Sequence, residues 1–556
     1  MGWKDRLVLQ ERLDYSNMIN ARHIRPSLLA LGLLVGVLAP ACGTTTATTA
    51  TSHASAAASG PVSGGSMTII DGSDLKTWSP FTTNNTYPGS PMDELDAVYG
   101  TLIYQNVDDQ IVGNLAESLT TTDNVTWTLK LRPGLKFTDG TPFNADAVKY
   151  NYNWAANTEW GATSQAWIAT WAPSITVVNS TTLTIKLPAA NADFATEIAN
   201  LAPFIASPKA LGAATTLAAI KPVGAGAFKL LSWDPGVNAT VVRNPGYWDQ
   251  PLPYLNSIIF VDIAATASRI TTVVQGEATM MAGYPYQWGS DDNEPGVTDV
   301  KIPMQGLFYG YLNTAKGFFS SPLAREFLYE AVNPLEVMDA FTQVSTGYTA
   351  PSTYFPSTSP FYDSSLTFPK YNGTAAQALL AQIKASGVPM SVQIVSTVEP
   401  DTERLGGYIA QVLSTYGITV TQTYIDQTIL VQRCQTQLQF DICIPGGALV
   451  FNGPEPYSSQ LFTSTGTLNM SGYATMNTDI AATQSAVGQK ALYGAWQSVQ
   501  QDLMKDLPIY VYGAIDRYLL VRDNTGGLVF SDGGILQKQF LYLCPNVCDA
   551  AAKPGL

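Results

Sequence analysis

The residues that most often carry out chemistry in proteins are scarce in this chain. Its 556 residues include two histidines, His23 and His53, both close to the N-terminus. Without histidine in the rest of the chain, a Ser-His-Asp or Cys-His mechanism lacks its base there. Zinc, copper and nickel also lack their commonest ligand. Because no Gly-x-Ser-x-Gly, P-loop or His-Glu-x-x-His motif is present either, we expect no cofactor and no metal.

Carboxylates are the remaining candidates for catalysis. A pair of carboxylates can hydrolyse glycosides, and Glu117, Asp139 and Asp146 fall within one stretch. No local spacing singles out two of them, and the distance between side chains is not visible in a sequence. We therefore expect the protein not to be an enzyme, with a secreted carboxylate-based hydrolase as an alternative.

The N-terminus has the pattern of an export signal. Five basic residues within residues 1–27 precede an apolar run over residues 28–39, which is too short to span a bilayer. The run ends in small residues before Cys42, which resembles the lipobox of bacterial lipoproteins. We expect residues 1–41 to be a signal peptide and Cys42 to be lipidated and anchored to the membrane. An ordinary secretory cleavage near Ala41 is the alternative, and Met18 is an alternative start.

The four cysteines beyond Cys42 are Cys434, Cys443, Cys544 and Cys548. An even number in an exported protein suggests disulfides. Four cysteines allow three pairings, of which we favour the local ones, 434 with 443 and 544 with 548. Free thiols are the alternative.

Composition separates a tether from a folded body. Residues 42–65 are almost entirely Thr, Ala, Ser and Gly, which predicts a flexible tether. The chain is 46% hydrophobic, with 11 Trp, 27 Tyr and 20 Phe, so the body can bury a large core. The formal net charge of −14 argues against a nucleic-acid partner, which would need a basic surface. A charged fraction of only 13% fits a surface exposed to acid, because additional titrating groups would be a disadvantage there.

Hydrophobic patterns in the body predict a mixed α/β protein. Alternation of apolar and polar residues predicts strands over residues 127–131 and 182–187. Other short runs predict strands over residues 65–70, 257–262, 390–395, 418–420 and 507–512. Helices are predicted from residue 144 and over 264–276, 374–385, 401–416 and 491–505. Asn144 and Thr374 are the expected N-caps. The strand–helix–strand order over residues 390–420 predicts a parallel pair.

Several segments, taken in order, resemble one family. They are residues 115–119 (LAESL), 127–148 (WTLKLRPGLKFTDGTPFNADAV), 222–229 (PVGAGAFK), 242–248 (VRNPGYW), 276–277 (GE), 313–314 (NT) and 322–326 (PLARE). This order is similar to that of the family 5 extracellular solute-binding proteins, the oligopeptide- and dipeptide-binding receptors of bacterial ABC importers. We expect these motifs to build the fold rather than to touch a ligand.

The resemblance implies a two-lobed α/β fold of the periplasmic-binding-protein (Venus flytrap) type with an extra third domain. Domain I would comprise residues 66–105, 222–305 and 510–550, domain II residues 106–221, and domain III residues 306–509, with the ligand between domains I and III. The implied function is that of a lipid-anchored monomeric receptor at the cell surface or in the periplasm. It would close on a peptide or peptide-like solute by hinge motion and deliver it to the transmembrane subunits of an ABC permease.

One loop departs from the pattern of the peptide-binding members. In those members an acidic residue in a domain III loop pairs with the peptide ammonium group. The corresponding residues 449–457 (LVFNGPEPY) place Asn452 there, and an amide offers dipoles but no charge. This favours an N-blocked peptide or a neutral solute such as an oligosaccharide, unless Glu455 substitutes or the alignment is displaced by a few residues.

Aromatic-rich loops supply the other expected ligand contacts, because a mostly apolar cleft needs aromatic walls with a few polar groups. The expected contacts are Trp78, Phe81, Tyr286, Trp288, Tyr309, Asn313, Phe451, Asn452 and Glu455. A place in the core explains each one individually as well. Nickel and haem receptors share the fold, but the absence of histidine from the body disfavours them. A sensor that kept the fold and lost transport is the third interpretation.

Overall fold

The computed structural model describes residues 61–545 and residue 548, apart from 73–74, 82–91, 107–109, 158–164, 264, 289–293, 358, 427–428, 431, 446–447, 451–456, 465, 467 and 532–535. The predicted signal peptide, Cys42 and most of the predicted tether lie outside the described residues. So do three predicted ligand contacts, Phe451, Asn452 and Glu455. Within the described residues, no helix combines the length and the apolar character that crossing a membrane requires.

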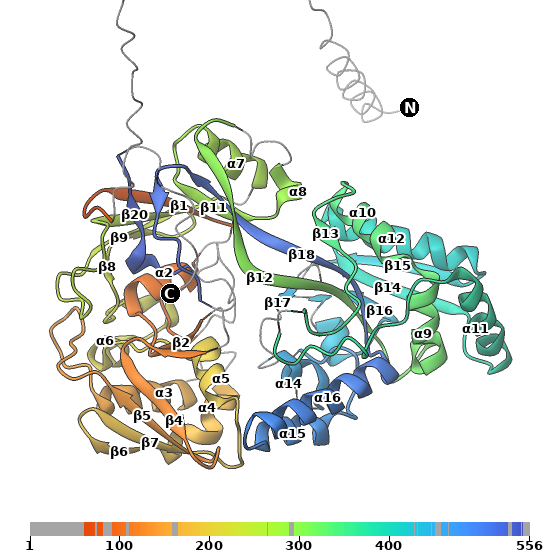
Figure 1. Cartoon of the computed structure of the whole chain (residues 1–556), viewed down its shortest axis with the longest axis horizontal. Helices are drawn as coiled ribbons and strands as arrows, with labels where there is room; N and C mark the ends of the chain where they lie inside the picture. Colours follow the sequence, from red (N-terminus) through yellow and green to blue (C-terminus); the bar gives the residue numbers. More distant parts are fainter. Residues whose placement is uncertain are drawn as a thin grey trace, which may run out of the picture. The chain divides into compact units, whose positions relative to one another are not determined.

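Twelve strands form one mixed sheet (Figure 1). They are β1 (Ser66–Asp71), β8 (Phe228–Asp234), β9 (Asn238–Arg243), β10 (Ser257–Asp262), β11 (Met280–Gly283), β12 (Val297–Leu312), β13 (Tyr348–Thr349), β14 (Ser391–Thr397), β15 (Thr419–Ile425), β16 (Ile442–Ile444), β17 (Ala448–Val450) and β18 (Ile509–Arg522). The main path is β15-β14-β16-β12-β18-β11-β1-β10-β9-β8, with β13 on β18 and β17 on β12. The predicted parallel pair is present as β14 and β15, and β1 is parallel to both β10 and β11.

Three smaller sheets complete the β-structure. The largest of them is antiparallel, in the order β4-β5-β7-β6. Its strands are β4 (Ala116–Thr121), β5 (Thr126–Leu131), β6 (Thr176–Asn179) and β7 (Thr182–Lys186). The two-stranded sheets pair β2 (Ile103–Gln105) with β3 (Ile111–Gly113) and β19 (Thr525–Gly526) with β20 (Tyr542–Leu543).

Helices cover these sheets. The α-helices are α2 (Met92–Tyr99), α3 (Ala145–Asn157), α4 (Gln165–Trp171), α5 (Phe194–Leu201), α6 (Pro208–Ala213), α7 (Thr266–Val274), α8 (Pro285–Trp288), α9 (Pro322–Ala331), α10 (Pro334–Thr342), α11 (Gly373–Ala385), α12 (Pro400–Thr415), α14 (Tyr457–Phe462), α15 (Asn477–Ser485) and α16 (Gln489–Asp506). Shorter helical turns are η1 (Ala172–Ser174), η2 (Leu217–Ala219), η4 (Phe318–Ser320), η5 (Gln432–Thr436) and η7 (Lys538–Phe540).

The helix caps agree with the sequence in one case and differ in another. Asn144 caps α3 as predicted, because its Oδ1 accepts from the Ala147 amide at 3.0 Å. Helix α11 begins one residue earlier than predicted, and its cap is Asn372 rather than Thr374. The Asn372 Oδ1 accepts from the amides of Thr374 and Ala375, both at 3.2 Å. An amide oxygen two residues upstream therefore satisfies the first free N–H groups of the helix.

Strand β18 is much longer than the predicted strand over residues 507–512. It continues to Arg522 because it pairs with β12 along most of its length and with β11 over residues 518–521. Gly513 lies within it, where a Cβ atom would collide with the Met338 side chain. The continuation is set by neighbours that are distant in sequence, so local alternation did not reveal it.

Buried apolar side chains form three large cores, which we number along the chain. The first core lies around β1, β8–β10 and α2 and includes Trp78, Phe228 and Phe260. The second core lies between the β4–β7 sheet and helices α3–α5. The third core lies around β12, β14, β16, α9–α12 and α16. Two local disulfides, Cys434–Cys443 and Cys544–Cys548, are formed.

Candidate functional site

Strands β12 and β18 are shared between the first and third cores, and their Val297 and Leu520 also enter a smaller apolar cluster with α7. The Ile302 and Leu519 side chains lie in the first core, whereas Leu307 and Ile515 lie in the third. Between these positions the pairing is irregular, with a register shift between Lys301 and Gln305, and a second shift follows at residues 308–309, inside the third core. One antiparallel pair therefore connects the first and third cores through an interrupted ladder.

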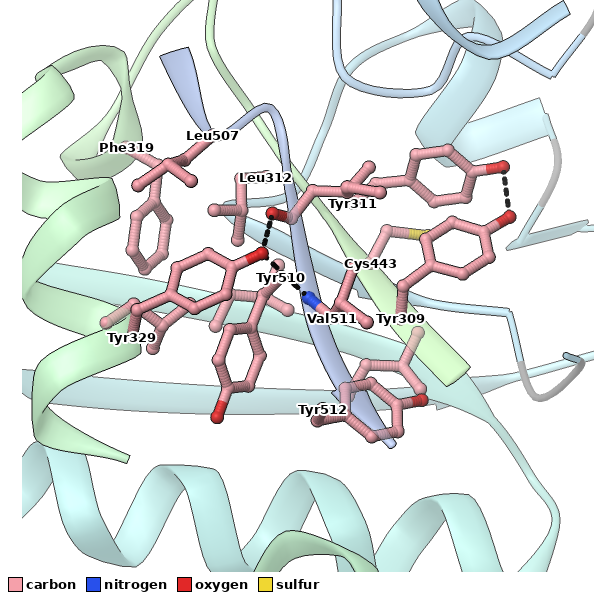
Figure 2. Close-up of a cluster of buried hydrophobic side chains, with 14 of the residues drawn as sticks. Tyr309, Tyr311, Leu312, Phe319, Tyr329, Cys443, Leu507, Tyr510, Val511 and Tyr512 are labelled. Carbon is pink, nitrogen blue, oxygen red and sulfur yellow. Dashed lines mark hydrogen bonds between the residues drawn. The ribbon is translucent and has the colours of Figure 1, made fainter. Parts of the chain in front are cut away.

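Tyrosines fill the part of this pair that belongs to the third core (Figure 2). The hydroxyls of Tyr309 and Tyr311 lie 2.9 Å apart and share a hydrogen bond. The Tyr329 hydroxyl donates to the Ile509 carbonyl at 2.9 Å and accepts from the Val511 amide at 3.0 Å. Burial raises the pKa of Tyr309 and Tyr311 above the usual range, so both stay neutral. The predicted contact Tyr309 is thus buried in the structure, with its hydroxyl bonded to a neighbour.

The predicted contact Asn313 follows β12 and is fully buried. Its Nδ2 donates to the carbonyls of Leu438 and Phe440 at 3.0 and 2.8 Å. Its Oδ1 accepts from the amides of Ala315 and Lys316, both at 3.2 Å. These four bonds fix the turn after β12, which explains an amide at this position without a ligand.

Trp78 and Phe81, three residues apart, enter different cores. Trp78 lies in the first core and packs edge-on against Trp233, with ring centroids 6.1 Å apart. Phe81 lies in the second core against Tyr152 and Trp154. The segment that carries them therefore fastens the first core to the second.

Among the predicted contacts whose side chains are described, Tyr286 is the one that stays partly exposed. Its ring stacks on the ring of Tyr284, with the centroids 5.7 Å apart. It also meets the ring of Phe341 in α10 edge-on, with the centroids 6.2 Å apart. Tyr284 in turn contacts Phe308 of β12 and lies 5.4 Å from the Arg517 guanidinium. We call Tyr284, Tyr286, Phe308 and Phe341 the aromatic seam. Trp288 ends α8, and its side chain lies outside what the structure describes.

An acidic cluster that the sequence reasoning missed lies at the end of β1. Asp71 and Asp262 are register partners at the carboxyl ends of the parallel strands β1 and β10. Asp93 and Glu94 occupy the first turn of α2, and Asp96 follows. We call these five residues the acidic cluster. The sequence did contain a signal for this cluster, because the strands SMTIID and SIIFVD both end in Asp. Ligands of open α/β sheets bind beyond the carboxyl ends of the strands.

Burial dominates the electrostatics of the acidic cluster. It raises the pKa of Asp71 well above the usual range, and the neighbouring Glu94 and Asp93 carboxylates raise it further. Burial also raises the pKa of Glu94 to about 8 and that of Asp96 to about 6. The Lys538 ammonium is 1% exposed, donates to Asp93 and lies 3.9 Å from Asp96. The cluster can therefore hold protons near neutral pH around one buried lysine.

The motif residues join the first core to the second. The Arg132 guanidinium lies 3.8 Å from the centroid of the Trp248 ring, a cation–π contact. A Cβ atom at Gly224 or Gly226 would collide with the backbone of α2, so glycine permits the close approach. Asn244 Nδ2 donates to the Gly226 carbonyl at 2.8 Å. These residues build the scaffold, as the sequence indicated.

The predicted ligand contacts do not converge on one site in the described part of the chain. Trp78 lies in the first core, Phe81 in the second and Tyr309 in the third, and Tyr286 of the aromatic seam packs against the third core. The loop predicted to carry Asn452 follows β17, which pairs with β12. Among the described residues, no group of three or more Asp, Glu, Cys or His side chains is arranged to hold a metal ion.

Comparison with known proteins places this geometry in a family. The profile of the bacterial extracellular solute-binding proteins, family 5 Middle, matches residues 110–469. The glutathione-binding protein GsiB of Escherichia coli (strain K12) is 28% identical over 366 residues, which are 65% of this chain and 69% of that protein.

Solved structures show the same fold. The oligopeptide-binding protein AppA of Bacillus subtilis, solved with a nonapeptide, matches with a TM-score of 0.72 at 17% identity over 87% of this chain and all of that one. The ABC transporter substrate-binding protein CtaP of Listeria monocytogenes matches with a TM-score of 0.73 at 19% identity, over 86% of this chain and 99% of that one. The fold is that of the two-lobed periplasmic binding proteins, and the chain belongs to family 5 of the bacterial extracellular solute-binding proteins.

Proposed function

We propose that this protein is the solute receptor of an ABC importer and that it captures a peptide or a peptide-like solute. The observation that carries the proposal is the strand pair β12–β18, which is shared by the first and third cores and interrupted between them. The relatives support the ligand class. GsiB is a glutathione-binding protein, and the ABC transporter-associated periplasmic binding protein DppA of Helicobacter pylori was solved with the peptide STSA.

Closure on the ligand would occur at the interrupted ladder. A register shift lets two paired strands bend or twist locally, because the backbone there lacks regular partners. The motion would bring the third core toward the first. In this proposal domain I comprises residues 66–105, 222–305 and 510–550, domain II residues 106–221, and domain III residues 306–509. The aromatic seam flanks this joint, since its tyrosines come from α8 and the residue before it, and its phenylalanines come from β12 and α10.

Tyr286 and the loop after β17 are the proposed ligand contacts. Tyr286 is half-buried and offers an aromatic face and a hydroxyl. Asn452 in that loop stands where peptide-binding members have an acid, which favours a ligand without a free ammonium group. This position supports the second candidate function, a receptor for a neutral solute such as an oligosaccharide.

Delivery requires that the receptor stay near its permease. The basic and apolar N-terminal segments followed by Cys42 support lipid anchoring after export, with the folded body as a monomer beyond the tether. A Cys42→Ser variant would then leave the membrane fraction and appear in the soluble fraction of the envelope.

A thermal-shift screen tests the ligand class. Glutathione, di- to nonapeptides with free and acetylated N-termini, and neutral oligosaccharides would be added to the purified protein. A ligand at 100 times its Kd stabilises the folded state by about 2.7 kcal/mol, so binding gives a clear rise in Tm. Stabilisation by peptides supports the proposal. Stabilisation by oligosaccharides alone overturns it in favour of the second candidate.

A further inference from the structure

Two hydrogen bonds join the periphery of the second core to the periphery of the third. Nδ2 of Asn124, in the turn between β4 and β5, donates to the Ala486 carbonyl at 2.9 Å. The amide of Ala192, which precedes α5, donates to the Gln484 carbonyl at 2.6 Å. We call these four residues the clasp. In Figure 1 helices α5 and α15 approach each other here, away from the paired strands β12 and β18.

The donor side of the clasp is built by two turns that brace each other. Asn124 has a φ of 57°, in the left-handed region that asparagine tolerates. Its carbonyl accepts from the Asn191 amide at 2.7 Å, and Asn191 Oδ1 accepts from the Asp193 amide at 2.9 Å. These bonds fix the two turns against each other, and with them the two donors of the clasp, the Asn124 side chain and the Ala192 amide.

The acceptor side is the carboxyl end of helix α15. The last carbonyls of a helix lack partners within it and need others. The helix ends where the Ala486 amide donates to the Thr483 carbonyl at 3.2 Å, which leaves the Gln484 and Ala486 carbonyls to accept from across the contact. The clasp therefore satisfies helix-end acceptors with donors from a different core.

The clasp is weak compared with the cores that it connects. Among the described residues, the apolar clusters on its two sides have no member in common: Phe194 and Ile198 belong to the second core, and Ile480 and Trp496 to the third. Two partly exposed hydrogen bonds without an apolar seal contribute little net free energy, so they can open and close reversibly.

We propose that the clasp is a latch that holds the closed form of the receptor and sets how long a ligand stays, without contacting the ligand. This inference rests on the proposed function, because it needs the β12–β18 pair to act as the joint. A contact present only in the closed form shifts the equilibrium toward that form, and it slows release of whatever is enclosed.

Two variants of Asn124 separate loss of the bond from strain. Asn124→Gly removes the donor while glycine keeps the positive φ. Asn124→Asp keeps the shape but sets a carboxylate against the Ala486 carbonyl. The matched control is Asn179→Asp, at the end of β6 in the same sheet. There Oδ1 accepts from the Thr181 amide at 2.9 Å, a bond that aspartate also makes.

Pulsed electron–electron resonance on the ligand-free protein measures the two forms directly. Spin labels would be attached at Val178→Cys and Lys384→Cys, both exposed, in a Cys42→Ala background. We expect a short and a long distance. The short-to-long ratio should fall roughly 2- to 10-fold in Asn124→Gly and further in Asn124→Asp, while Asn179→Asp leaves it unchanged.

Identical distributions in all four proteins, or a parent protein with no short distance, would overturn the latch. The outcome is separable from the proposed function because no ligand is used. If the distributions shift as expected but the thermal-shift screen finds no binding of peptides, the latch stands and the peptide assignment fails. If peptides bind and the distributions do not shift, the reverse holds.

Discussion

Two regions of this molecule bury polar groups in opposite ways. In the third core, tyrosine hydroxyls bond to one another and to the backbone, and burial keeps them neutral. In the acidic cluster, Lys538 pairs with Asp93 and lies near Asp96, and burial raises the pKa of Asp71, Glu94 and Asp96. The first arrangement is insensitive to pH, whereas the second couples folding to proton binding. The comparison shows that equal burial of polar groups has different consequences when the groups carry charge.

The largest expected effect is that of removing the buried ammonium group. Lys538→Met should lower the free energy of unfolding by about 3–5 kcal/mol at neutral pH, because Asp93 and Asp96 lose their buried counter-charge. Urea unfolding followed by tryptophan fluorescence measures the loss. The control is Lys301→Met. Its ion pair with Asp516 is 2.6 Å long, but the lysine is 55% exposed, so we expect about 0–1 kcal/mol. Equal losses in the two variants would show that burial does not make the Lys538 contacts stronger than an exposed ion pair.

The pH dependence of the free energy of unfolding should be the next largest effect. Glu94 has a pKa of about 8 in the folded protein, above its unfolded value near 4.5, so the folded state binds more protons between these values. The stability contributed is fully present below the unfolded pKa and is lost as the pH rises through the folded one. We expect roughly 2 kcal/mol or more to be lost between pH 5 and pH 8.

Glu94→Gln should flatten that slope, since an amide does not titrate. The second core sharpens this test, because burial also raises the pKa of Asp193 to about 7 and that of Glu197 to about 8. A residual slope in Glu94→Gln that disappears in Glu94→Gln/Glu197→Gln would assign the remainder to the second core. Stability that increases from pH 5 to pH 8 would contradict both assignments.

A smaller effect, independent of pH, is expected among the tyrosines. Tyr329→Phe should cost about 1–3 kcal/mol, because the buried carbonyl of Ile509 and amide of Val511 both lose a partner. The loss should be the same at pH 5 and pH 8. Tyr371→Phe is the control, since Tyr371 is 52% exposed and should change stability little. A pH-dependent loss in Tyr329→Phe would show that a titrating group affects the third core as well.

The smallest effect concerns the pair Tyr309 and Tyr311. Either Tyr→Phe change alone should cost about 1 kcal/mol, because it leaves the other hydroxyl buried without its partner. The double variant should cost no more than one single variant, since no unpaired hydroxyl remains. A double-mutant cycle in urea measures this coupling, and additive losses would show that the two hydroxyls act independently.

The sequence predicted local elements better than it predicted assemblies. The strands over residues 65–70 and 257–262 and the parallel pair over residues 390–420 were visible because alternation and helix signals are local. The cap of α11 was misplaced by two residues, since Asn372 and Thr374 are both suitable cap residues and only the backbone path distinguishes them. The length of β18 depends on β11 and β12, which no local pattern reports.

The site was less accessible than the fold for a physical reason. An aromatic residue in a loop can enter a core or line a cleft, and the sequence does not separate the two. Trp78 and Phe81 illustrate this, since both are buried, and in different cores. The acidic cluster needs β1, β10 and α2 to be brought together, and its partner Lys538 comes from a fourth part of the chain, the η7 turn. Its signal, an Asp at the end of two strands, becomes meaningful only once the strands are known to be parallel neighbours.

The fastening between the first and second cores has a mechanical consequence. Trp78 and Phe81 anchor one short segment in both cores, and the Arg132–Trp248 contact joins the two cores at another place. In the closure that we propose, these contacts would keep the first and second cores together, so that the two cores would move as one body. A receptor of two such bodies and one joint would have essentially one degree of freedom. Work done by a ligand on one body would then be transmitted to the other rather than dissipated in internal bending.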